Sequence, residues 1–158
     1  MCLGKNDSQV QGIHRGSMED AFCILPRLWI GNRFSAISDD FLQKNRITSI
    51  FNCSKELPFS LSSLIHRRHR IAFGLNNELH VYHIIQDYHR GEHILIHEYE
   101  DFHTCATFMT MALMLILGEP SPRILLCLRS KRIILPNHHT KTIEEFEKMY
   151  IKSPLLNI

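Results

Sequence analysis

The chain has 158 residues and a mass of 18.5 kDa, which fits one globular domain. Hydrophobic residues make up 44% of the sequence and charged residues 22%, which excludes a disordered chain and a disulfide-dense miniprotein. The formal net charge of +2 argues against a dedicated nucleic-acid binder, because such domains normally carry a strong basic excess.

The cysteines indicate a reducing compartment. Their number is odd, and no two form a C-x-x-C pair, which is typical of reduced intracellular thiols. The first twenty residues lack the apolar stretch of a signal peptide, and the longest apolar run, 111–117, is too short to span a membrane. We therefore expect a cytoplasmic or nuclear protein without a membrane anchor. The five cysteines are Cys2, Cys23, Cys53, Cys105 and Cys127.

The predicted domain begins after a polar N-terminal segment, 1–20, which we expect to be flexible. Two short apolar runs, 21–25 and 28–30, predict strands on either side of Pro26. The dipeptide Gly31-Asn32 is a turn signal that ends the second strand.

One short helix and two further strands follow. Ser38 is a helix N-cap residue, and the two aspartates after it suit the first turn of a helix over 38–45. The β-branched run 47–51 predicts a buried strand. Residues 55–68 read as a loop or weak helix, and 67–73 as another strand.

The central part of the chain predicts helix, strand and helix in succession. Apolar residues at helical spacing predict a helix over 78–89, and the run 93–97 suits a central strand. A polar stretch, 98–103, leads into a long apolar helix over 104–117, which Gly118 should end.

Two more helices complete the domain. Ser121 as N-cap, with Pro122 at the first helical position, predicts a helix start, and Thr142 with Glu145 resembles a capping box for a last helix. We place the domain at 21–152 and a C-terminal tail at 153–158. Alternation of strands and helices predicts an α/β fold with a mostly parallel central sheet flanked by helices.

The segment 97–107 reads His-Glu-Tyr-Glu-Asp-Phe-His-Thr-Cys-Ala-Thr between a predicted strand and a predicted helix. It resembles the signature H-C-x-x-G-x-S-R-S-A-T of the dual-specificity protein phosphatases, in the Cys-dependent tyrosine phosphatase superfamily. The run 24–31 resembles the opening motif of that family, and 129–147 resembles its closing motif. The resemblance covers about 22–150 and implies the same α/β fold.

The resemblance also implies that the catalytic groups are missing. Glu98 stands where the family has its nucleophilic cysteine, and Thr104 stands where it has the arginine that grips the phosphoryl group. Asp101 aligns with the loop glycine. The general acid of the family falls near residues 75–76, which hold no carboxylic acid, and Glu78 is the nearest acidic residue.

Two residues of the loop leave alternatives open. The carboxylate of Glu98 either folds back onto the loop N–H groups, in the place of phosphate, or points to solvent while the loop relaxes. Cys105 lies in the first turn of the following helix, where it is either a half-buried structural thiol or a nucleophile.

The polar residues of the loop also raise the question of a metal. Adjacent strand residues point in opposite directions, and no H-E-x-x-H pattern occurs, so we expect no metal and no other cofactor. The family resemblance implies a structural role for His97, through hydrogen bonds to the loop. The residues considered were His97, Glu98, Glu100, Asp101 and His103.

The run His66-Arg67-Arg68-His69-Arg70 is the densest basic segment, and it either docks an acidic partner or forms an ordinary solvated face. We take Arg67, Arg68 and Arg70 as candidate binding residues.

Taken together, the sequence predicts a catalytically inactive, dual-specificity-phosphatase-like protein that acts by protein binding, as a scaffold or regulator of phosphosignalling. The expected partner is a phosphoprotein, a kinase or an active phosphatase relative, and neither a nucleic acid nor a membrane. Two alternatives stay open: a residual or altered hydrolase that uses Glu98 or Cys105, and a structural component of a larger assembly.

Overall fold

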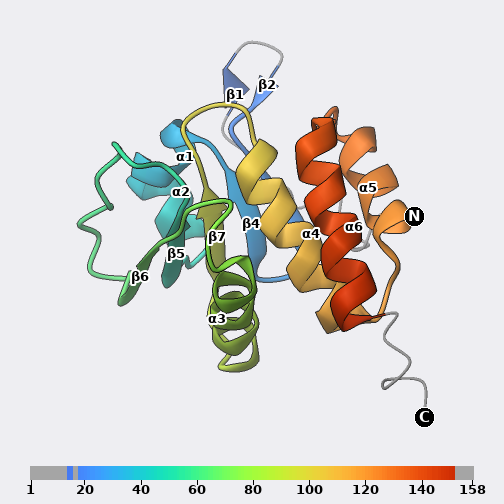
Figure 1. Ribbon diagram of the computed structural model, residues 1–158. Helices are drawn as coiled ribbons and strands as arrows, with labels where there is room; N and C mark the ends of the chain where they lie inside the picture. The colour runs from blue at the N-terminus through green and yellow to red at the C-terminus, as the bar shows by residue number, and fades with distance from the viewer. Residues whose placement is uncertain (1–13, 16–17, 152–158) are drawn as a thin grey trace.

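The computed structural model describes residues 14–15 and 18–151 (Figure 1). Its strands are β1 (His14–Arg15), β2 (Met18–Glu19), β3 (Ala21–Leu25), β4 (Leu28–Gly31), β5 (Ser49–Asn52), β6 (Arg67–Arg70) and β7 (Ile94–His97). Its helices are α1 (Arg33–Ile37), α2 (Asp39–Lys44), α3 (Asn77–His89), α4 (His103–Leu117), α5 (Ser121–Ser130) and α6 (Asn137–Tyr150).

A five-stranded sheet in the order β3-β4-β7-β5-β6 forms the centre of the domain. Strands β4, β7, β5 and β6 run parallel, and only β3 is antiparallel, to β4. The predicted α/β fold with a mostly parallel sheet is therefore confirmed. Because the four strands are parallel, their carboxyl ends all lie at one end of the sheet, and their amino ends all lie at the opposite end.

Each face of the sheet has its own core, as strand alternation requires. Helices α3 to α6 cover one face and α1 and α2 cover the other (Figure 1). Ile94 and Ile96 of β7 pack under the larger layer, while Leu95 between them packs under the smaller one. Helix α4 is buried around its whole circumference over 105–114, as expected of a helix enclosed by the sheet and its neighbouring helices.

Several predicted helix ends are confirmed. The Ser38 hydroxyl accepts a hydrogen bond from the Phe41 N–H at 3.2 Å, so Ser38 caps α2. Gly118 ends α4 with φ of 67° and donates its N–H to the Met114 carbonyl.

Two predicted helix starts are wrong in detail. Helix α6 begins at Asn137, directly after Pro136, so Thr142 lies inside the helix and donates its hydroxyl to the His138 carbonyl. Ser121 is the first helical residue of α5, and its N–H is capped at 2.7 Å by the Glu147 carboxylate of α6.

The segment expected to be flexible, 1–20, contains a small antiparallel pair, in which His14 is paired with Glu19 and Arg15 with Met18. The rest of that prediction, at 1–13 and 16–17, and the tail prediction at 153–158 lie outside the described residues. Within the described part of the chain, no helix combines the length and the hydrophobicity needed to cross a membrane.

Gly31 ends β4 next to the loop that follows β7, and the position is sterically full. A Cβ atom at Gly31 would lie 2.2 Å from Ser35 Oγ and 3.0 Å from Leu95 Cδ1. We expect Gly31→Ala to lower the free energy of unfolding by about 1–3 kcal/mol, because overpacking forces neighbours out of place. Urea denaturation of Gly31→Ala and the wild type measures this difference in the free energy of unfolding. Equal stability of Gly31→Ala and the wild type would contradict the expectation.

Candidate functional site

The loop 98–102 connects the carboxyl end of β7 to the first turn of α4, and Glu98 is its central side chain. The Glu98 N–H donates to the Gly31 carbonyl at 3.2 Å, which fixes the start of the loop against β4. Its Oε1 accepts the N–H of Thr104 at 2.7 Å and the N–H of Cys105 at 3.2 Å. Of the two orientations considered for Glu98, the structure has the carboxylate folded back onto the loop.

These two N–H groups belong to the first turn of α4, where backbone donors have no partner within the helix. Such a terminus attracts anions, because the donors converge and the helix dipole adds positive potential. The carboxylate of Glu98, which belongs to the same chain, therefore occupies the position where an external anion would bind.

Glu98 is held in a protonation equilibrium near neutrality. Burial, and then the neighbouring charge of Asp101, raise the pKa of the Glu98 carboxyl to about 7, although the N–H groups of Cys105 and Thr104 favour the ionised form. Burial removes water from the ionised carboxylate, and Asp101 repels its negative charge, so both effects favour the protonated form. Near pH 7 the carboxyl is therefore present in both forms.

Arg33, at the start of α1, holds the outer part of the loop. Its N–H donates to the Tyr99 carbonyl at 3.1 Å, and its guanidinium lies 4.3 Å from the centre of the Tyr99 ring. The same guanidinium lies 3.6 Å from Glu100 Oε2. Sequence reasoning missed Arg33, because 66 residues separate it from Tyr99 and its only local signal was the preceding turn.

The tight curvature of the loop falls on Phe102 and not on Asp101, the residue aligned with the family glycine. Phe102 has φ of 63°, and its side chain is buried against Phe22 with ring centres 5.5 Å apart. Asp101 Oδ1 accepts the His103 N–H at 3.1 Å, and Asp101 Oδ2 lies 3.6 Å from His103 Nδ1. The loop thus turns without glycine because packing of Phe102 compensates for the strained backbone.

Two thiols lie next to the loop, and of these Cys105 is buried whereas Cys53 is partly buried. Cys105 is fully buried, and not half-buried as expected; its Sγ lies 3.4 Å from the Phe102 carbonyl oxygen. Burial, and then the charge of Glu98, raise the pKa of Cys105, and the same two causes raise the pKa of Cys53. Both thiols are therefore protonated, which is the unreactive form.

His97 is fully buried at the end of β7, and burial lowers its pKa to about 4. Neither ring nitrogen has a partner with the distance and angles of a regular hydrogen bond among the described residues, but interaction with the Glu98 backbone partly opposes the lowering of the pKa. The expected orientation of the loop by hydrogen bonds from this ring therefore stays a prediction.

The segment 73–77, where the family resemblance places a general acid, folds as a turn and holds no carboxylate. The Gly74 N–H donates to Asn77 Oδ1 at 3.0 Å, and the Phe73 ring packs 4.4 Å from that of His139. Glu78 lies in the exposed first turn of α3. Over residues 14–15 and 18–151, no group of three or more His, Cys, Asp and Glu side chains is arranged to hold a metal ion.

The basic run is divided between the two faces of the edge strand β6. Arg67 Nε lies 2.8 Å from the buried Asp87 carboxylate of α3. Arg68 donates instead to the carbonyls of Ser60 and Ser62, and Arg70 donates to those of Ser54 and Leu57. The three arginines therefore do not form one continuous surface, and their part in binding stays a prediction.

Comparisons with solved structures identify the fold. A crystal structure of DUSP15 is 26% identical over 80% of this chain and 86% of that chain, with a TM-score of 0.68. Human tyrosine phosphatase-like serine/threonine/tyrosine-interacting protein is 20% identical over 80% of this chain and 94% of that chain, with a TM-score of 0.68. A mouse putative dual specificity phosphatase complexed with zinc tungstate is 17% identical over 88% and 93%, with a TM-score of 0.73.

No family model and no curated protein matches the sequence. The structural neighbours nevertheless agree with one another, so the chain has the fold of the dual-specificity phosphatases.

Proposed function

We propose that this protein is a catalytically inactive phosphatase-like protein that acts by binding other proteins. The observation that carries the proposal is the position of the Glu98 carboxylate on the Thr104 and Cys105 N–H groups. A phosphoryl group needs those donors, so a tethered carboxylate competes with it at a high effective concentration.

The chemistry of the loop supports loss of catalysis. Phosphoryl transfer to an enzyme needs an activated nucleophile, and both nearby thiols, the partly buried Cys53 and the buried Cys105, have raised pKa values. A carboxylate nucleophile at Glu98 would have to leave its two N–H donors before it attacked phosphorus.

Charge at the loop supports exclusion of phosphate. Glu98, Glu100 and Asp101 place three acidic groups within four residues, and Arg33 forms an ion pair with Glu100 at the rim. Two like charges about 4 Å apart repel by about 4 kcal/mol near a protein surface. A phosphate dianion would meet that repulsion without an arginine at position 104 to offset it.

The proposed role is scaffolding or regulation of phosphosignalling in the cytoplasm or nucleus, through a contact that does not require phosphate. One structural neighbour is itself named a phosphatase-like interacting protein. The partner remains a phosphoprotein, a kinase or an active phosphatase relative.

Hydrolysis of an aryl phosphate tests the proposal directly. The purified protein should show no turnover above the buffer rate, with or without divalent cations. Turnover that disappears in Glu98→Ala or Cys105→Ala would overturn the inactive assignment and favour the altered hydrolase.

A double variant, Glu98→Cys with Thr104→Arg, tests what else is missing. We expect its activity to remain about 10²–10⁴-fold below that of an active relative, because segment 73–77 supplies no general acid. Full activity of this variant would show that the rest of the site is intact and that only two residues were lost.

A further inference from the structure

The parallel topology gathers arginines at the amino ends of the strands, at the edge of the sheet opposite the Glu98 loop. Arg27 directly precedes β4, Arg46 lies three residues before the start of β5, Arg67 begins β6, and Arg90 follows the last turn of α3. The strand register aligns Leu28, Ser49, Arg67 and Ile94, so these positions meet at one edge.

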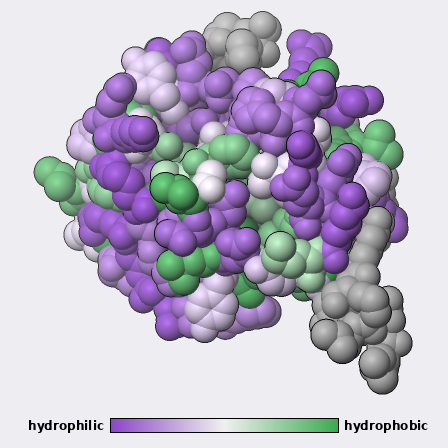
Figure 2. Space-filling view, viewed as in Figure 1, coloured by the Kyte–Doolittle hydropathy of each residue, from purple (hydrophilic) through white to green (hydrophobic). Residues whose placement is uncertain are grey.

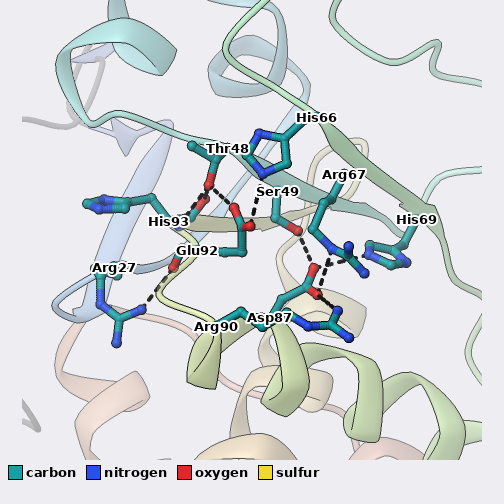
Figure 3. A network of polar contacts seen from close by, with 10 residues as sticks. All are labelled: Arg27, Thr48, Ser49, His66, Arg67, His69, Asp87, Arg90, Glu92 and His93. Atoms are coloured by element: carbon teal, nitrogen blue, oxygen red, sulfur yellow. Dashed lines mark hydrogen bonds and ion pairs between the residues drawn. The ribbon is translucent and has the colours of Figure 1, made fainter.

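Two carboxylates lie within this group of cations (Figure 3). Asp87 is buried and lies 2.8 Å from Arg67, 3.1 Å from His69 and 3.4 Å from Arg90. Glu92 accepts from the Thr48 hydroxyl and lies 2.9 Å from His66 Nε2. Asp87 is therefore paired with two of the four arginines, and Glu92 is paired with His66.

Arg27 and Arg46 have no carboxylate partner within the described ranges. Arg27 Nη1 donates to the carbonyls of Tyr88 and Glu92, and its guanidinium lies 4.3 Å from the centre of the Tyr88 ring. Arg46 is exposed in the turn between α2 and β5. Burial, and then the charge of Arg27, lower the pKa of His93, and the charge of Arg46 acts in the same direction.

We propose that these residues form a docking surface for an acidic segment of a partner protein. We call the surface the basic pole and define it by Arg27, Arg46, His66, Arg67 and Arg90. Arg27 is held in place by two carbonyls and a ring, so little side-chain freedom is lost on binding. The inference rests on the proposed binding role and names the chemistry of the partner.

A short acidic segment fits this surface better than a continuous polyanion does. The carboxylates of Asp87 and Glu92 lie among the arginines and repel an unbroken row of phosphates, whereas a short segment can place its charges on Arg27, Arg46 and Arg90. The net charge of +2 is also far from that of a nucleic-acid-binding domain.

Hydrophobic attraction offers a weaker basis for docking on the face drawn in Figure 2. There, hydrophobic groups occur as small spots separated by hydrophilic ones. Large apolar side chains such as Leu75, Leu79 and Leu126 are exposed singly or along one helix edge, which is normal for a soluble surface.

Fluorescence anisotropy with a labelled oligoglutamate peptide tests the basic pole. The wild type should bind saturably, and raising the salt concentration should weaken binding. The triple variant Arg27→Gln, Arg46→Gln, Arg90→Gln should bind about tenfold or more weakly, because three partly screened charge contacts are removed. The matched control Arg123→Gln, Arg129→Gln, Lys148→Gln removes the same charge from α5 and α6 and should change affinity less than about twofold.

The single variant Arg46→Glu provides a second test in case the triple variant does not fold. Arg46 is exposed, so its replacement should leave the fold intact. It should keep the melting temperature and still weaken peptide binding about threefold or more. Absence of saturable binding, or equal losses in the triple variant and its control, would overturn the proposal. Tighter binding of duplex DNA or anionic vesicles, lost in the triple variant, would also overturn it in favour of a polyanion.

The two proposals fail separately. Turnover of an aryl phosphate would remove the inactive assignment and leave the peptide result unchanged. Failure of the peptide to bind, with no turnover, would remove the basic pole and leave the inactive assignment in place.

Discussion

The free energy of unfolding of the wild type is expected to fall as the pH rises from about 5 to 8. In Glu98→Gln this fall should be absent. The folded-state pKa of Glu98, about 7, lies above its ordinary value of 4.5, so the native protein binds more protons than the unfolded chain between those values. Wild-type stability therefore falls as pH rises through this window, whereas glutamine does not titrate and its amide oxygen still accepts the two N–H groups. At pH 8 the variant should be more stable by about 2–3 kcal/mol, given 1.36 kcal/mol for each pKa unit and partial solvent screening.

Urea denaturation of both proteins across the pH range measures this difference, and the histidine contributions cancel because both proteins share them. Glu100→Gln is the matched control, since Glu100 is an exposed acid of the same loop. Its stability curve should run parallel to that of the wild type. Parallel curves for wild type and Glu98→Gln would mean that Glu98 titrates as a solvated carboxyl and does not occupy the loop.

Asp87→Ala should be among the most destabilising single substitutions in the chain. Asp87 is 1% exposed, and its carboxylate accepts the buried Ser49 hydroxyl at 2.7 Å while facing Arg67 and Arg90. Removing one member of a buried ion pair costs about 3–5 kcal/mol, and we expect about 3 kcal/mol because both arginines are partly exposed. The midpoint and slope of urea denaturation provide the measurement.

Two variants sharpen this test. Asp87→Asn keeps an oxygen acceptor for Ser49 but loses the charge, so its loss of stability should be intermediate. Glu144→Ala removes an exposed acid from α6 and should stay within about 0.5 kcal/mol of the wild type. If Asp87→Ala were as stable as Glu144→Ala, the network in Figure 3 would not anchor β6 to α3.

The fold was largely predictable because its signals are local. Alternating strand and helix patterns predicted the parallel sheet, and Ser38 and Gly118 predicted helix ends that depend only on neighbouring residues. The predicted start of α6 was wrong because the helix begins earlier, directly after Pro136, and the predicted cap of α5 was wrong because another element supplies it. The cap of Ser121 comes from Glu147 of α6, 26 residues away in the chain, and no local pattern reveals it.

The candidate site was predictable in position but not in geometry. The order of strand, polar loop and buried helix located it, and the residues at 98 and 104 predicted the loss of catalytic groups. The orientation of Glu98 depends on the balance between two N–H donors and the cost of burial, which the sequence does not encode locally. The basic run was predicted either to dock an acidic partner or to form a solvated face, and the period-two alternation of β6 sends Arg67 to one side and Arg68 to the other.

The central claim is that the chain fills its own anion-binding position, and backbone NMR of Thr104 and Cys105 tests it most directly. We predict that inorganic phosphate, up to about 10 mM, causes no saturable shift of these two N–H signals in the wild type. The reason is that both N–H groups already donate hydrogen bonds to the Glu98 carboxylate. Glu98→Ala with Thr104→Arg restores free donors and a guanidinium and should show the shift. A saturable phosphate response of the same two signals in the wild-type protein would contradict the account.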